Sequence, residues 1–320
     1  MAFSEDILSR LEDLEKKYEA MGQDMVSYLD GLLYSDYLTY WEYVKSDALL
    51  SLQHPLTSFP DEKIFIVYHQ ITELYFSLIT HEFDQLASNN DLRAPEFLER
   101  MKRANRYFSN LIYSFDIMIE GMEREQFLKF RMALLPASGF QSGQFRIIEI
   151  YSTDFVNLLE PYKRDEYKKV VSQDIKVMYE HLYWKKGATE LATGKKTLTL
   201  KQFEQKYSER LVRLGKKKMK TNLWKLYENL DLGELKEDIE NEMRDYDSNV
   251  NINWALAHYK SAVKYLNMEP HNIEATGGTN WQKYLPPRYQ RIMFFPELWS
   301  EDDKENWGRS WVKSAIAGIE

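Results

Sequence analysis

Residues 61–88 limit the fold more than any other part of the chain. Their centre, "IFIVYHQITELYFSLITHE" at 64–82, is the most apolar run in the sequence. A helix over this range is apolar on nearly every side, and such a helix sits in the middle of a bundle. The run nevertheless holds polar groups, which a buried helix must provide with partners. They are His69, Gln70, Glu73, His81 and Glu82.

The rest of the chain also predicts helices. Glycine (13) and proline (9) are scarce among 320 residues, so few positions interrupt a helical pattern. In residues 5–21 apolar side chains recur at intervals of three and four, between Ser4 and Gly22. No run alternates as a strand does, and no segment repeats. The predicted helices cover 5–21, 35–53, 61–88, 94–121, 124–134, 143–158, 164–184, 199–214, 217–230 and 233–267.

A single all-α helical-bundle domain over residues 1–320 is the simplest architecture for these helices. Residues 1–34 form its N-terminal helical extension. Residues 185–198, within which lies "KKGATELATGKKT", have the least regular pattern and are a candidate mobile segment.

Composition excludes several kinds of protein. Without cysteine there is no disulfide, thiolate metal site, cysteine nucleophile or C-x-x-C-H haem attachment. The net charge of −8 argues against nonspecific nucleic-acid binding. The basic stretch at 210–220 predicts a solvated helix junction at Gly215. No signal peptide is recognisable, and no uncharged run reaches the ~20 residues of a membrane span. We therefore expect a cytoplasmic protein that uses neither nucleic acid nor membrane.

Two histidines stand in chemically suggestive positions. His69 and Glu73 are four residues apart, so they share a helix face and could contribute to a metal site with partners from elsewhere. His258 belongs to an apolar stripe of a long helix: Val250, Trp254, His258, Ala262 and Tyr265. It is either a hydrogen-bonded core histidine or an axial ligand of a flat apolar cofactor. With no cysteine available, imidazole is the leading haem ligand here.

Arg131 and the segment "EATGGTN" are further candidates for ligand binding. Arg131 follows Phe127 by four residues, among apolar neighbours. It either packs its aliphatic stem or clamps a substrate carboxylate in two places. The two glycines beside Thr276 and Thr279 let a backbone approach a ligand closely, or simply form a surface turn.

Together these motifs resemble the tryptophan 2,3-dioxygenase family. The resemblance runs through "LTYWEYVKSDALLSLQHPL", "DEKIFIVYHQITELYFSLITHEFDQL" and "FLKFRMALLPASGFQSGQFRIIE". It continues in "WALAHYKSAVKYL", "ATGGTNWQKYL" and "FFPELW". The blocks H-Q-x-x-E-L-x-F and SGFQS-x-Q-F-R, in this order and at this spacing, are highly specific together.

The resemblance implies a role for each matching residue. His69 corresponds to the catalytic distal histidine that meets the indole N–H, and His258 to the proximal iron ligand. Arg131 corresponds to the carboxylate clamp, and Thr276 to the loop residue that bonds the amino-acid end. Phe65 corresponds to a wall of the same pocket, Phe127 to the substrate-binding residue beside the clamp, and Ser138 to a residue near the haem. Tyr40, Tyr43 and Val44 correspond to residues that enter a neighbouring subunit's pocket.

The implied reaction converts L-tryptophan and O2 to N-formyl-L-kynurenine, the first step of tryptophan catabolism by the kynurenine route. The implied cofactor is one non-covalent haem b per subunit, and the implied assembly is a homotetramer, a dimer of dimers, in which the N-terminal extension packs on a neighbour. The nearest alternative is a related haem enzyme that inserts one oxygen atom into a modified tryptophan. A non-haem metal bundle using His69 and Glu73, and a non-catalytic helical interaction protein, are alternatives from other classes.

Overall fold

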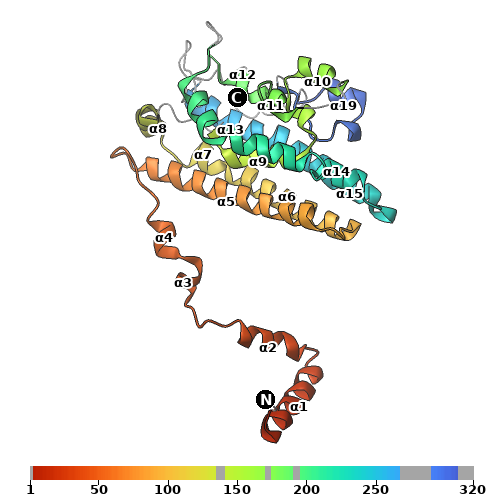
Figure 1. Cartoon of the computed structure of the whole chain (residues 1–320). Coiled ribbons are helices and arrows are strands. Elements are labelled where there is room, and N and C mark those ends of the chain that lie inside the picture. The colour runs from red at the N-terminus through yellow and green to blue at the C-terminus, as the bar shows by residue number, and fades with distance from the viewer. Residues whose placement is uncertain (1–2, 135–140, 170–173, 190–194, 267–289, 309–320) are drawn as a thin grey trace. The chain divides into compact units, whose positions relative to one another are not determined.

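A computed structural model describes residues 3–134, 141–169, 174–189, 195–266 and 290–308. The chain divides into two compact units, Met1–His54 and Pro55–Glu320. The described residues hold helices and two isolated β-bridges, Leu159 with Leu182 and Thr189 with Lys196, but no strand. The predicted all-α fold class is therefore confirmed (Figure 1).

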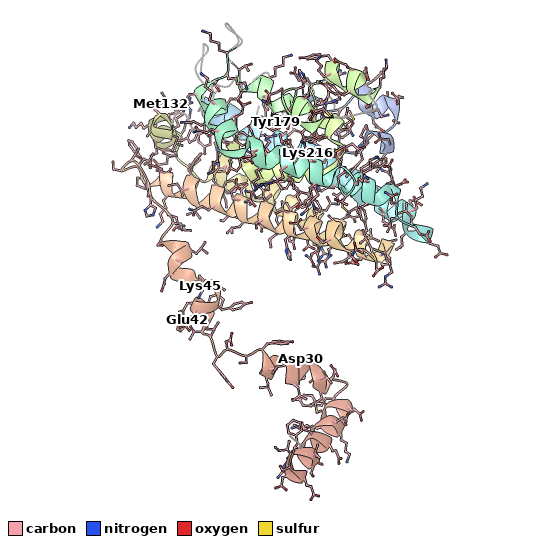
Figure 2. The ribbon with its side chains drawn as sticks, in the orientation of Figure 1. Asp30, Glu42, Lys45, Met132, Tyr179 and Lys216 are labelled. Carbon is pink, nitrogen blue, oxygen red and sulfur yellow. The ribbon has the colours of Figure 1, made fainter. Side chains whose placement is uncertain are left out.

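The N-terminal unit is a series of short helices, and none of its described residues, from Phe3 onward, is buried. They are α1 (Glu5–Ala20), α2 (Met25–Leu33), α3 (Tyr40–Val44) and α4 (Ser46–Leu50). Figure 2 shows their side chains pointing outward on all sides, among them Asp30, Glu42 and Lys45. The prediction of one helix over 35–53 is wrong, because Lys45 adopts a left-handed conformation (φ 55°) that ends α3 and begins α4.

The second unit is built around α5 (Asp61–Ser88) and α6 (Ala94–Ser114), which lie side by side and run antiparallel (Figure 1). The helix α15 (Lys236–Ser248) packs on α6, and α9 (Gly143–Ser152) packs between α5 and α13 (Leu198–Lys218). The predicted bounds of α5 are confirmed. The start of α5 is fixed by Glu62, whose buried carboxylate accepts hydrogen bonds from Leu56 N, Thr57 N and Thr57 Oγ1.

The remaining helices are mostly short. They are α7 (Asp116–Glu120), α8 (Arg124–Phe130), α10 (Pro161–Lys168), α11 (Ile175–Tyr179), α12 (Tyr183–Gly187), α14 (Leu223–Glu228), α16 (Trp254–Leu266) and α19 (Glu301–Glu305). Single 3₁₀ turns cover Arg131–Leu134, Phe155–Leu158, Gly233–Leu235 and Pro296–Leu298, and a π-helical turn, Asn249–Asn253, joins α15 to α16.

Further sequence expectations need correction. The predicted helix over 164–184 is wrong, because α10, α11 and α12 replace it. Gly215 is no solvated junction: it is buried inside the continuous helix α13, and a Cβ there would lie 2.8 Å from Ile175. Finally, α5 is not enclosed on every side, since Ile71, Leu74 and Leu78 are 37%, 53% and 44% exposed.

Among the described residues, no helix combines the length and apolar character needed to cross a membrane.

Candidate active site

The candidate site lies at one end of the bundle, where four helices meet. The N-terminal half of α5 contacts α7 and α8, and α16 contacts the same two helices. His69 comes from α5 and His258 from α16, so two segments almost 190 residues apart in sequence contribute the two imidazoles. An aromatic cluster fills the space around them.

The imidazole of His69 is oriented by its own helix. Its Nδ1 lies 2.7 Å from the backbone carbonyl oxygen of Phe65, and the two rings are 4.1 Å apart between centroids. Since a carbonyl oxygen only accepts hydrogen bonds, Nδ1 carries the proton and Nε2 presents a lone pair. Burial lowers the pKa of His69, which outweighs the opposing effects of the Phe65 carbonyl and the Glu73 charge. His69 is therefore neutral at pH 7.

His258 repeats this arrangement on α16. Its Nδ1 lies 3.3 Å from the carbonyl oxygen of Trp254, again four residues earlier. Burial lowers the pKa of His258 to about 4, and a repulsive contribution from His69 acts in the same direction. A neutral imidazole with its Nδ1 held by a carbonyl is the form in which histidine binds a metal through Nε2.

Aromatic rings connect the two histidines. The ring of Tyr68 lies 6.0 Å from His69 and 5.5 Å from Phe115, and Phe115 lies 4.6 Å from His258. Trp254 packs against both Phe115 and His258. These contacts create an apolar environment in which an unpaired charge would be costly.

Phe65 and Phe127 form a second aromatic wall. Their ring centroids are 6.3 Å apart, and Phe127 also packs 4.7 Å from Tyr265 of α16. Phe130, fully buried, contacts both Phe65 and Phe127. Arg131 follows directly, with 7% of its surface exposed, and burial lowers the pKa of its guanidinium. The structure thus brings Phe65, Phe127 and Arg131 to the same end of the bundle as the histidines.

Glu73 is a supporting group one turn beyond His69. The side-chain amide of Gln144, on α9, donates to the backbone carbonyl and to the carboxylate of Glu73, at 2.9 Å each. No cluster of three or more His, Asp or Glu side chains that could hold a metal ion occurs in the described part of the chain. Glu82, farther along α5, pairs with Arg100 at 2.6 Å and Arg103 at 3.4 Å and so has the partners that a buried carboxylate needs.

Two predicted site residues, Ser138 and Thr276, lie outside the described residues. Tyr40, Tyr43 and Val44 belong to the N-terminal unit, where their side chains are exposed. Sequence reasoning missed Tyr68 and Phe115 as site residues. Tyr68 adjoins His69 in sequence, but Phe115 ends α6, and only the packing of α16 against that end brings it to His258.

Fold and site together define an all-α protein with two neutral, carbonyl-oriented imidazoles in one aromatic enclosure. A family model described as tryptophan 2,3-dioxygenase matches residues 30–268, about three quarters of the chain. The chain is 28% identical over 282 residues to the tryptophan 2,3-dioxygenase of Ruegeria sp. (strain TM1040), and 29% identical over 302 residues to that of Bacillus anthracis. Each alignment covers 83% of this chain and 92% of the relative.

The chain belongs to the tryptophan 2,3-dioxygenase family. It is accordingly an oxidoreductase of that type. Every predicted site residue except Thr276 falls within the matched range.

Proposed function

We propose that this protein is a haem-dependent dioxygenase that opens the indole ring of L-tryptophan with O2 to give N-formyl-L-kynurenine. The observation that carries the proposal is the pair of neutral imidazoles, His69 and His258, each with Nδ1 against the carbonyl four residues earlier, in one aromatic enclosure. Both atoms of O2 enter the product as the C2–C3 bond of the indole breaks.

The residues around His258 fit a haem. A porphyrin needs apolar surroundings and one basic axial nitrogen. Trp254 and Phe115 supply aromatic surfaces beside the imidazole, and the low pKa of His258 leaves its Nε2 unprotonated at neutral pH. His258 would hold the iron and Ser138 would adjoin the ring of one haem b. Bound haem would supply the activation of O2.

His69 would recognise the indole N–H. With its Nδ1 proton directed at the Phe65 carbonyl, Nε2 is an acceptor and can take the indole hydrogen bond. The amino-acid end of the substrate would be held by Arg131, whose planar guanidinium matches a carboxylate in two places, and by Thr276. Phe65 and Phe127 would enclose the indole and exclude water.

The N-terminal unit would complete the site of a neighbouring subunit. Tyr40 and Tyr43 are each 76% exposed, and none of the helices α1–α4 buries a residue. Solvent-exposed aromatic residues that cluster on one segment are typical of a surface that binds a partner. Tyr40, Tyr43 and Val44 would therefore enter the pocket of a second copy within a homotetramer, a dimer of dimers.

Mixed oligomers test this exchange. A Tyr43→Ala/Tyr40→Ala variant and an Arg131→Leu variant should each be nearly inactive alone. Co-expressed in one cell, they should recover activity, because some sites then receive an intact N-terminal unit and an intact clamp. Additive residual activities, with no recovery, would reject the exchange of N-terminal units.

Labelled oxygen tests the reaction. Purified protein loaded with haem, L-tryptophan and ¹⁸O₂ should give a product carrying two heavy oxygen atoms. Incorporation of one heavy atom would instead identify the alternative, a haem enzyme that inserts a single oxygen atom. Absence of haem absorbance after purification from haem-supplied cells would reject the cofactor.

A further inference from the structure

The helix that carries His258 contains one turn of unusual width. The helix α15, the π-helical turn Asn249–Asn253 and the helix α16 form a continuous helix, because Ser248 (φ −63°, ψ −44°) and Trp254 (φ −62°, ψ −44°) on either side are helical. A π-turn holds one residue more than an α-turn, and such turns are rare. Its position, directly before the segment that holds His258, calls for a physical explanation.

The buried residues of this long helix show what the wide turn changes. Up to and into the turn, the fully buried apolar positions are Ile239, Met243, Tyr246 and Val250, at intervals of four, three and four. Beyond it, Trp254 and His258 pack on Phe115 between α6 and α7, and Ser261 and Tyr265 donate hydrogen bonds to backbone carbonyls of α7, again at intervals of four, three and four. Where the two series meet, the interval is four three times in succession: from Tyr246 to Val250, then to Trp254, then to His258.

A uniform α-helix could not keep Tyr246 and His258 on one face. It turns about 100° per residue, so a separation of twelve positions would leave the two side chains about 120° apart. The additional residue of a π-turn reduces this angle to about 20°. Both side chains do face the same layer, since Tyr246 packs 5.7 Å from Phe108 and His258 packs 4.6 Å from Phe115, both on or at the end of α6. Without the wide turn, Ala257 would take the direction that His258 has.

Side chains on two sides hold the wide turn in place. Asp247, with no exposed surface, accepts hydrogen bonds from Asn251 Nδ2 at 2.7 Å, Phe294 N at 2.9 Å, Trp299 Nε1 at 3.0 Å and Phe295 N at 3.1 Å. This carboxylate therefore ties the turn to the returning segment 292–299.

The opposite side is held by a row of amides. Asn253 donates to Asn249 at 3.0 Å, and Asn249 donates to Asn105 of α6 at 3.3 Å. Asn105 in turn donates to the carbonyl and carboxylate oxygens of Glu242, at 2.9 and 2.7 Å. Asparagine is a poor helix former, so three asparagines in five residues are accounted for by these contacts and not by helix propensity.

We propose that the wide turn Asn249–Asn253 sets the direction in which His258 points, and that Asp247 and Asn105 are positioning residues that maintain it. The inference rests on the proposed role of His258 as the haem ligand. The direction of the imidazole then depends on the number of residues in the turn between α15 and α16.

Residue count gives a sharp test. Deletion of Asn251 should let the wide turn become an ordinary α-turn, which leaves every later residue on its present face. Insertion of one alanine after Asn251 cannot be absorbed in this way, because the turn already holds one additional residue. The insertion should therefore rotate His258 by about 100°. The deletion variant should thus retain the haem spectrum of an imidazole-bound protein. The insertion variant should resemble His258→Ala and should regain the imidazole-bound spectrum when free imidazole is added.

The apoprotein gives a second readout that needs no haem. Its thermal midpoint should fall far more on insertion than on deletion, because only insertion displaces Trp254 and Tyr265 from their partners. Equal losses for the two variants, or a deletion variant that does not fold, would overturn the proposal. If His258→Ala keeps an unchanged haem spectrum, the proposed role of His258 as haem ligand fails. The difference in thermal midpoint between the insertion and deletion variants would still show whether the wide turn sets the direction of the helix face that carries His258.

Asp247→Asn tests the positioning residue, with Asp245→Asn, an exposed neighbouring carboxylate, as its matched control. Asp247 acts on His258 only through the turn, so Asp247→Asn should weaken haem retention by less than the roughly 10- to 100-fold that removal of a direct partner of a metal ligand costs. Free imidazole should restore binding, and Asp245→Asn should have no effect. A lower thermal midpoint with unchanged haem affinity in Asp247→Asn would show a purely structural role and reject the positioning role.

Discussion

The backbone carbonyl oxygen of Phe65 lies 2.7 Å from Nδ1 of His69, one turn later in α5. The contact determines which nitrogen of the ring bears the proton, and so it makes Nε2 a hydrogen-bond acceptor. The same relation joins Trp254 to His258 at 3.3 Å. Each imidazole is thus oriented by the helix that carries it, before any substrate or cofactor arrives.

His69→Ala is expected to loosen selectivity for the indole N–H. In the native protein, 1-methyltryptophan leaves Nε2 of His69 without a donor, which costs about 1–3 kcal/mol. The ratio of kcat/KM for tryptophan to that for 1-methyltryptophan should therefore fall roughly 5- to 150-fold in the variant. His81→Ala, on the exposed side of the same helix, is the control. Equal proportional losses for both substrates would exclude His69 as the indole acceptor.

Arg131→Leu is expected to remove the interaction with the substrate carboxylate. Breaking a desolvated charge pair costs roughly 2–4 kcal/mol, so kcat/KM for tryptophan should fall about 30- to 1,000-fold. Tryptamine, which lacks the carboxylate, should be affected much less. Lys129→Leu removes an exposed charge two residues away and should leave both values near those of the native protein. Near-native kcat and KM for tryptophan in Arg131→Leu would reject the clamp.

His258→Ala should abolish axial ligation. The expected result is loss of the Soret band of the purified protein, or its shift to that of a haem without imidazole. His181→Ala changes a histidine between α11 and α12, which packs on Tyr167 and not on the aromatic cluster of the site, and should leave the spectrum unchanged. A native spectrum in the His258 variant would assign the ligand to another residue.

The apoprotein should lose stability as the pH falls from 6.5 towards 4. Burial lowers the pKa of both His69 and His258, the latter to about 4, from an ordinary value of 6.5. Between these pH values the unfolded chain takes up protons that the folded protein refuses, so acidification favours unfolding. For His258 the effect is at most about 3 kcal/mol.

Urea unfolding of the apoprotein at pH 7 and pH 5 measures this loss. His258→Asn, which does not titrate in this range, should show a smaller difference between the two pH values than the native apoprotein. An identical difference in both proteins would mean that His258 does not contribute.

Gly215→Ala should destabilise the second unit. The new Cβ would lie 2.8 Å from Ile175 and 2.9 Å from Phe155, and overpacking of this kind costs about 1–3 kcal/mol. Gly31→Ala is the matched control in another helix, α2, where no atom lies within 4 Å of the new Cβ. Thermal unfolding followed by circular dichroism should show a lower midpoint for the first variant. An unchanged midpoint would mean that α13 and α11 can separate at little cost.

The sequence by itself determined the fold class and the bounds of α5, in which the run of apolar side chains is long and uninterrupted. Residues 61–88 form one helix because their apolar pattern continues without a glycine or proline. The chemical types at the site also follow from sequence: two histidines, an arginine and several phenylalanines at helical spacing. These inferences succeed because they depend on side chains and on local backbone preference, both of which can be read along the chain.

Where the local sequence pattern and long-range contacts disagree, only the tertiary structure decided the backbone conformation and the packing. The intervals of four from Val250 to His258 fit an α-helix locally, but contacts of Asp247 with Phe294 and of Asn249 with Asn105 hold a π-turn there. Gly215 resembles a helix end next to a run of lysines, yet its missing side chain makes room for Phe155 and Ile175. In both places the deciding partner lies many residues away, and its effect on free energy outweighs the small local preferences that a sequence displays.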